Sequence, residues 1–405
     1  MYVTYLSDIF LQDNKIIQGK EHSCQVNYEK NEVAEALVDL RNEASSTDIP
    51  MPQLYKKHEE KLMDKGYHLL DSIPSFENVK HSLYNARHKS TGVTKSVYSS
   101  AQEVVVPDQY VDFILDDYWD SDKRIIIFCT SEARNIIQNI DEYFGDGTFK
   151  SCPRPFVQLF TLHGDIGSGN ATTNVVPLIY ALLTDKKKDT YVKMINMIKS
   201  ALPAWQVKKY HCDYEAAAIN AFLEGFPNVD IKGCYMHYSK NIWKTAKQLG
   251  HNKSKPEKRI VGMCAVLPLL PAEYVTEAWQ HIKNELVACN FLKMDKFIKY
   301  VNRVWLNKRI KKFISVFGQR HRTNNVAESF HGVLNKMVNK NTVNLLRLLN
   351  ALRTVGNLSK KTPRKQRTGV KRRLQYVLTD DYIRHVQLEL IDGHITVGNA
   401  VEKLR

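Results

Sequence analysis

Three acidic residues stand where carboxylates could do chemistry. Asp146 has a glycine on each side, Asp213 ends a predicted strand directly before a predicted helix, and Glu328 begins a predicted helix. Carboxylates at strand ends of one sheet can converge, and Mg²⁺ prefers oxygen ligands. Two such ions can activate a nucleophile and stabilise a leaving oxygen in phosphoryl transfer. The pattern therefore makes a two-metal site geometrically possible.

Each acid also has a simpler explanation. Asp146-Gly147 is a common turn signal. Asp213 can cap the helix that follows it, and Glu328 can be an exposed helical acid. The neighbouring Gly145 and Gly147 are expected to let a phosphate backbone approach closely. Spacing alone does not choose between these interpretations.

The elements around these acids predict an α/β fold. Apolar runs indicate strands over 124–130, 143–150, 157–165, 175–183, 207–212 and 229–233. Helical spacing appears over 188–202, 214–224 and 235–248, so a mixed sheet is expected between flanking helices. From residue 251 to about 320 the pattern is helical, and helices resume over 324–339 and 342–355.

Composition excludes several classes of protein. The 405 residues carry 58 Lys plus Arg against 43 Asp plus Glu, a net charge of +15, which favours a polyanionic partner. No apolar run approaches the ~18 residues that span a bilayer, so no membrane partner is expected. Residues 1–20 do not read as a secretory signal. The seven cysteines are scattered, which favours a reducing compartment.

An ordered set of motifs resembles the transposase domain of Mutator-like elements. The stretches are 146–149, 177–183, 213–217, 232–238, 323–325 and 328–331, within a resemblance over about 110–355. It implies an RNase H-like mixed sheet with flanking helices, interrupted by an all-α insertion between Asp213 and Glu328, whose sequence separation is 115. It also implies that Asp146, Asp213 and Glu328 form a DDE triad binding Mg²⁺ or Mn²⁺. Asp146 would bridge the two ions.

The function implied by the resemblance is phosphodiester hydrolysis and strand transfer at transposon ends. The expected partners are double-stranded DNA, both terminal repeats and target, and further copies of the chain. The expected location is the nucleus. The alternative is a domesticated DNA-binding transcriptional regulator that keeps the fold and lacks catalysis. A protein-interaction module using the basic surface is a further alternative, which salt-sensitive DNA binding would exclude.

Two further motifs are candidate metal sites. Cys234 and His237 match the family's Cys-x-x-His motif. A closed Zn²⁺ site needs two more ligands, so the pair could serve structural support or DNA positioning instead. Near the N-terminus, residues 15–24 resemble the end of a FLYWCH-type zinc finger, with His22 and Cys24 as its last ligands. No cysteine precedes Cys24, so the match is a truncated remnant or an ordinary hairpin.

The segment 359–373 is basic and contains no acid. Its cations are Lys360, Lys361, Arg364, Lys365, Arg367, Lys371, Arg372 and Arg373. They suit binding to a phosphate backbone or nuclear import, and a solvated flexible segment is the alternative.

The expected organisation has six parts. The first two are a finger remnant over 1–28 and a helical and loose linker over 29–107, whose residues from 76 onward are basic and expected to be loose. The transposase core follows in two parts, over 108–250 and, with the Glu328 helix, over 321–358, and a helical insertion over 251–320 separates them. The last part is a basic C-terminal tail over 359–405.

Overall fold

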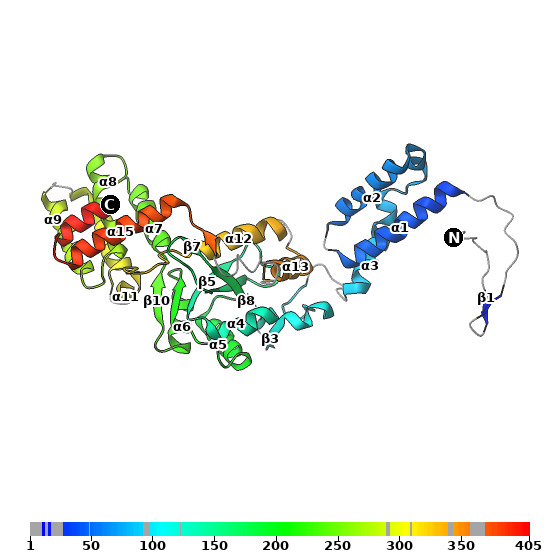
Figure 1. Cartoon of the computed structure of the whole chain (residues 1–405), viewed down its shortest axis with the longest axis horizontal. Coiled ribbons are helices and arrows are strands. Elements are labelled where there is room, and N and C mark those ends of the chain that lie inside the picture. The colour runs from blue at the N-terminus through cyan, green and yellow to red at the C-terminus, as the bar shows by residue number, and fades with distance from the viewer. Residues whose placement is uncertain are drawn as a thin grey trace. The chain divides into compact units, whose positions relative to one another are not determined.

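The computed structural model divides the chain into two compact units, Met1–Thr94 and Lys95–Arg405, which are described separately (Figure 1). The residues it describes are 10–12, 15–17, 27–47, 49–91, 98–121, 123–288, 292–307, 310–338, 343–356 and 369–405. Within these residues, every helix is too short or too polar to cross a membrane.

The first unit contains a short hairpin and three helices. Strands β1 (Phe10–Gln12) and β2 (Lys15–Ile17) pair antiparallel, as an ordinary hairpin would. Helices α1 (Tyr28–Ser46), α2 (Met51–Lys65) and α3 (Phe76–Thr91) follow, with a 3₁₀ turn at Tyr67–Ser72. His22 and Cys24, the residues predicted as the last ligands of a finger remnant, lie outside the described residues.

The three helices pack through a small apolar core of their own. Leu40, Leu54 and Leu83 are buried where α1, α2 and α3 meet. The expectation of a loose segment from residue 76 is wrong for α3, because its apolar residues cover α1. His81 and Lys89 of α3 are exposed. Because polar residues of this kind separate the few apolar residues of α3, its helical spacing was not recognised in the sequence.

A seven-stranded mixed sheet forms the centre of the second unit. The strands are β3 (Ile114–Trp119), β4 (Arg124–Cys129), β5 (Glu142–Thr148), β6 (Gln158–Asp165), β8 (Val175–Leu183), β9 (Lys209–Cys212) and β10 (Asp230–Gly233). Their order is β10-β9-β5-β6-β8-β4-β3. Strands β5, β9 and β10 are parallel, and all other pairs are antiparallel.

This order confirms the predicted RNase H-like fold. The hairpins β5-β6-β8 build one side of the sheet, and the helical crossovers to β9 and β10 extend the other. The edge strand β3 was not predicted, because its sequence, Ile-Leu-Asp-Asp-Tyr-Trp, carries two acids and no long apolar run.

Helices cover both faces of the sheet. On one face lie α5 (Lys188–Ala201) and α6 (Ala216–Gly225), where Phe222 stacks on Tyr210 of β9 with ring centroids 3.7 Å apart. On the other, α12 (Asn325–Val338) contacts β5 and β6, and α13 (Leu345–Gly356) contacts β8. A short helix α4 (Ser131–Ile136) follows β4. The fold therefore has three layers, a sheet between two sets of helices.

The segment over 251–320 is helical, as expected. It contains α8 (Lys255–Ala265), α9 (Val275–Ala288), α10 (Asp295–Tyr300), a π-helical turn at Val301–Trp305, and α11 (Lys311–Ile314). Helix α7 (Tyr235–Gln248) precedes this insertion and packs against α8. Ser254 and Glu257 form a capping box at the start of α8, which satisfies otherwise unpaired N–H groups.

The C-terminal residues join the insertion. Helices α15 (Leu374–Ile391) and α16 (Val397–Leu404) bury Val386, Ala400 and Val401 in the same cluster as α8 and α9 (Figure 1). Strand β11 (Val370–Lys371) pairs antiparallel with β7 (Thr172–Thr173), beside the core sheet. The chain from residue 374 onward is thus part of the helical cluster rather than a free tail.

Candidate active site

The first two acids lie at the same edge of the sheet. In the parallel pair β5 and β9, Gly145 stands opposite Cys212, so the next residues are Asp146 and Asp213. Asp146 lies inside β5, paired with Thr161, and is therefore not part of a turn. Asp213 is not the cap of α6 either, because Glu215 occupies that position. The simpler explanations for these two acids are both wrong.

The glycines beside Asp146 have a structural reason. A Cβ at Gly145 would lie 2.1 Å from the hydroxyl oxygen of Tyr210, and one at Gly147 would lie 1.7 Å from Nε2 of Gln158. Side chains alternate along a strand, so this is the face opposite Asp146. The expectation that these glycines admit a phosphate backbone is wrong, because protein side chains fill the space.

Asn324 fixes the helix that carries Glu328. Its side-chain amide donates to the Gly145 carbonyl at 2.9 Å, and its backbone N–H donates to Sγ of Cys234 at 3.2 Å. Asn324 is fully buried directly before α12, and Glu328 lies in the first turn of that helix. Asn324 stands in the motif over 323–325 and at the start of a predicted helix, without a predicted role of its own.

His237 lies between the second and third acids. Its Nδ1 is 2.8 Å from Oδ1 of Asp213, and its Nε2 is 3.4 Å from Oε1 of Glu328. Contact with Asp213, and next with Cys234, raises the pKa of His237 to about 10 against the opposing effect of burial. The imidazole is therefore protonated at neutral pH and neutralises part of the negative charge of the two carboxylates.

His331 connects the same helix to the first acid. Its Nδ1 is 3.1 Å from Oδ2 of Asp146, and its Nε2 is 3.0 Å from Oγ1 of Thr161. Residues three apart share a helix face, yet the His331 side chain is buried while that of Glu328 is 43% exposed and meets His237 at its rim. The simpler explanation for Glu328, an exposed helical acid, therefore agrees with its exposure. The spacing of three residues was the signal for His331, which stands in the motif over 328–331 without a predicted role of its own.

The residues present fit a hard divalent cation. Asp213 and Glu328 both lie against His237, and His331 joins the Glu328 helix to Asp146. Oδ1 of Asp213 is buried 2.8 Å from Nδ1 of His237, without hydrogen-bond geometry to any of the described residues. The Asp146 carboxylate is held in place, because the Gly147 N–H donates to its Oδ1 at 2.8 Å. An all-oxygen set of this kind is what Mg²⁺ or Mn²⁺ requires.

A groove of about 590 Å³ adjoins this site. Its walls are β7, β11, the start of α15, the segment around Arg320 and the first turn of α12, which contributes Asn325 and Ser329. Arg320, Lys371 and Arg373 are exposed in it and have no ion-pair partner among the described residues. Because Glu328 lies on the same turn of α12, the groove presents unpaired cations beside the candidate site.

The basic segment predicted to bind DNA is divided by the structure. Lys371 and Arg373 line the groove, whereas Arg372 forms an ion pair with Asp380 at 2.6 Å. Arg322 pairs with the same carboxylate. The remaining cations of the segment, Lys360, Lys361, Arg364, Lys365 and Arg367, lie outside the described residues.

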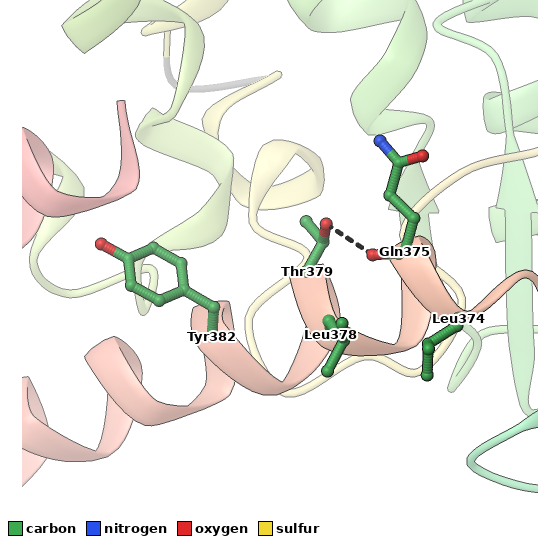
Figure 2. A pocket seen from close by; sticks show the side chains of 5 residues that line it. All are labelled: Leu374, Gln375, Leu378, Thr379 and Tyr382. Carbon is green, nitrogen blue, oxygen red and sulfur yellow. Dashed lines mark hydrogen bonds between the residues drawn. The ribbon is translucent and has the colours of Figure 1, made fainter.

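A second hollow lies on α15 and has a different character. Figure 2 shows its lining side chains, Leu374, Gln375, Leu378, Thr379 and Tyr382, on successive turns of the helix around a shallow depression of about 560 Å³. The drawn hydrogen bond is internal to the helix, from the Thr379 hydroxyl to the Gln375 carbonyl. The lining contains no acid, histidine or cysteine that could bind a metal, so the chemistry belongs to the sheet edge.

Comparison with known proteins finds a family match within this core. The RNase H-like sheet, with one acid on β5 and one directly after β9, defines the class of fold. Residues 143–241 match the family model of the MULE transposase domain, which supports a transposase-family function. No curated protein sequence matches the chain. Its similarity to the Drosophila P element transposase strand transfer complex covers 84% of this chain and 94% of that one, at 9% identity and a TM-score of 0.29.

One buried ion pair beside the groove gives a pH-dependent prediction. Burial raises the pKa of Asp165, but hydrogen bonds from His321, Gly167 and Ser168 outweigh it and lower the pKa from 3.8 to about 2. His321 lies on the segment that leads to α12, with Nε2 2.8 Å from Oδ2 of Asp165.

We expect about 2 kcal/mol of stability from this depressed pKa, present above pH 4 and lost as the pH falls from about 4 to about 2. Urea unfolding of wild type and Asp165→Asn at pH 7 and pH 3 measures it. The variant should be less stable at pH 7, and the difference should shrink at pH 3. An equal difference at both pH values would contradict the assignment.

Proposed function

We propose that this chain is a DDE-type transposase of the Mutator-like superfamily. The observation that carries the proposal is the pair of histidine bridges around the three acids. His237 approaches both Asp213 and Glu328, and His331 ties the Glu328 helix to Asp146. Three acids separated by 67 and 115 residues of sequence thereby approach one edge of an RNase H-like sheet.

The reaction proposed is phosphodiester hydrolysis followed by strand transfer. Water adds to phosphorus and the bond to the 3′ oxygen breaks, which leaves a 3′-hydroxyl and a 5′-phosphate. That hydroxyl then adds to a target phosphorus, and the 3′ oxygen of the target strand leaves. Asp146, bridging, with Asp213 and Glu328 would hold two Mg²⁺ or Mn²⁺ ions, whose chemistry is to lower the pKa of a nucleophile and neutralise developing charge.

The neighbouring residues position the carboxylates. His331 and Thr161 restrain Asp146, while Asn324 fixes the start of α12 against β5. Partners of this kind orient ligating groups, and their loss commonly costs 10–100-fold in metal affinity or activity. His237 balances the charge of Asp213 and Glu328 in the absence of cations.

The groove is the proposed path of the DNA backbone. We expect Arg320→Gln, Lys371→Gln and Arg373→Gln together to weaken binding to duplex DNA. Each lost phosphate contact should lower the slope of log affinity against log salt by about 0.9. Fluorescence anisotropy with labelled duplex over a range of salt concentrations measures this slope.

A matched control removes three exposed lysines of the insertion that do not line the groove. Lys253, Lys255 and Lys258 changed to Gln alter the net charge equally. An identical loss of slope in both triple variants would show that net charge, rather than the groove, governs DNA binding.

The experiment that tests the function is nicking of labelled DNA in varied Mg²⁺ or Mn²⁺. The DNA should carry the inverted repeats that flank the genomic locus. Metal-dependent nicking by wild type, lost in Asp213→Ala, is the expected result. DNA binding without nicking would favour the domesticated regulator instead.

The proposal carries expectations for the setting of the protein. A transposase needs chromosomal DNA and a second transposon end, so a nuclear location and a homo-oligomer are expected. Light scattering of the purified chain with and without paired-end DNA measures the second of these.

A further inference from the structure

A cluster of mixed metal-binding side chains lies at the edge of the sheet. Asp213 follows β9, Cys234 follows β10, and His237 is in the first turn of α7. Because Gly233 stands opposite Cys212 in this parallel pair, Cys234 and Asp213 leave the sheet side by side. One oxygen, one sulfur and one nitrogen atom of these residues lie within 4.8 Å of one another.

The contacts inside this cluster are incomplete. Asp213 Oδ1 and His237 Nδ1 are 2.8 Å apart, yet both are buried and neither is in hydrogen-bond geometry with a partner among the described residues. Their approach reflects opposite charge without a directed bond. Sγ of Cys234 receives one backbone N–H, from Asn324 at 3.2 Å.

The ligand atoms of this cluster favour a different ion from the one that suits the carboxylates of Asp146, Asp213 and Glu328. Mg²⁺ takes oxygen ligands, whereas a thiolate with an imidazole selects Zn²⁺ and similar cations. Three protein ligands with a fourth, open position are the ordinary set of a reactive zinc site. The second nitrogen of His237 faces Glu328 at 3.4 Å, in the place where a carboxylate commonly orients a zinc-bound histidine.

We propose that Asp213, Cys234 and His237 bind a thiophilic divalent cation such as Zn²⁺, and that an ion held there withdraws Asp213 from the Mg²⁺ or Mn²⁺ site. The binding of the thiophilic cation rests on the Asp213–Cys234–His237 cluster alone. The withdrawal of Asp213 rests on the proposed function, because it requires Asp213 to be a ligand of the catalytic ions.

The sharing of Asp213 makes the two metals competitors. Its carboxylate belongs to both ligand sets, and a tetrahedral ion on Cys234 and His237 fixes it toward α7. The cluster would therefore act as an inhibitory site, in which Zn²⁺ lowers the number of oxygen-ligated ions that the chain can hold.

Cobalt absorption tests the ligand set directly. Co²⁺ titrated into the metal-free full-length chain is expected to give one equivalent of tetrahedral d–d bands with a thiolate-to-cobalt band, both displaced by Zn²⁺. Cys234→Ser should lose the thiolate band and weaken Zn²⁺ binding more than about 100-fold, beyond the effect of an outer partner. Cys152→Ser, which removes a thiol outside the cluster, should retain the band.

His237→Gln keeps the test valid if Cys234→Ser does not fold. It should retain a cobalt–thiolate interaction of much lower affinity and altered d–d bands. Absence of a thiolate band in wild type, or a band that survives Cys234→Ser, overturns the proposed site.

Electron paramagnetic resonance of free Mn²⁺ tests the competition without any activity assay. One equivalent of Zn²⁺ is expected to release bound Mn²⁺ from wild type. Unchanged Mn²⁺ binding with the cobalt-reporting site filled overturns the competition. A chain that binds no Mn²⁺ counts against the proposed catalytic function, while the cobalt spectrum still decides the Asp213–Cys234–His237 site.

Discussion

Asp146→Asn is expected to abolish strand nicking while leaving DNA affinity nearly unchanged. The substitution keeps the size of the side chain and the acceptor for the Gly147 N–H, but removes the charge. In the proposed function Asp146 is the bridging ligand, and loss of such a ligand forfeits several kcal/mol of transition-state stabilisation, on the order of a 10³-fold fall in rate. Single-turnover nicking in Mg²⁺, beside anisotropy of the same DNA, measures both quantities.

Asp141→Asn is the matched control for this variant. Asp141 directly precedes β5, and its exposed carboxylate pairs with Lys208. It should nick like wild type, because it lies outside the cluster of acids. Normal nicking by Asp146→Asn would refute the triad, and a parallel loss of DNA binding would point to a folding defect instead.

Arg124→Met is expected to cost about 3 kcal/mol of stability, because it leaves the partly buried Asp117 carboxylate and two buried carbonyls without the buried guanidinium. Arg124 is 7% exposed and binds both carboxylate oxygens of Asp117, at 3.0 and 2.7 Å. It also donates to the carbonyls of Ala101 and Val104 at 2.8 and 2.6 Å. These bonds join edge strand β3 and the segment before it to β4.

Urea unfolding at pH 7 measures the effect as a shift of the midpoint. Arg303→Met, at an exposed arginine, should change stability by less than about 0.5 kcal/mol. Adding Asp117→Asn to Arg124→Met should recover part of the loss, since the unpaired, partly buried carboxylate charge is then removed. Full additivity of the two single changes would argue against a coupled pair.

Much of the core could be predicted because its elements are strongly patterned. The run Arg124–Cys129 is entirely buried, and the helix predicted over 235–248 has those bounds. Breaks that contain Gly or Pro separate the strands, so the succession of strands and helices along the chain could be predicted, but not the order of the strands in the sheet. Elements held by tertiary contacts were missed. Strand β11 has two residues and exists only because it pairs with β7, which lies about 200 residues earlier.

The residues of the candidate site also differ in how well their roles could be predicted from the sequence. Asp146 in a predicted strand and Asp213 at the end of another were visible in the sequence, and neighbouring parallel strands bring such residues together. The histidines were harder to interpret, because their roles depend on which side chain lies opposite them. His237 was noted with Cys234, yet its approach to Asp213 and Glu328 requires α7 and α12 to meet at the sheet edge. The partners that fill the space beside Gly145 and Gly147 likewise come from β9 and β6.

The packing of α15 and α16 on the insertion has a consequence for the choice of expression fragments. A clone limited to residues 143–241 would end inside α7 and would lack both β4 and Glu328. Leu182 of β8 pairs with Ile126 of β4, and both are fully buried, so removing β4 would expose an apolar strand.

A clone that ends after α13 would have a different defect. It would uncover the apolar side of α8 and α9 that α16 contacts, and the rest of the apolar cluster to which α15 contributes. A large exposed apolar patch promotes aggregation. The unit Lys95–Arg405 keeps all of these contacts together, and is therefore the fragment to express when the first unit is left out.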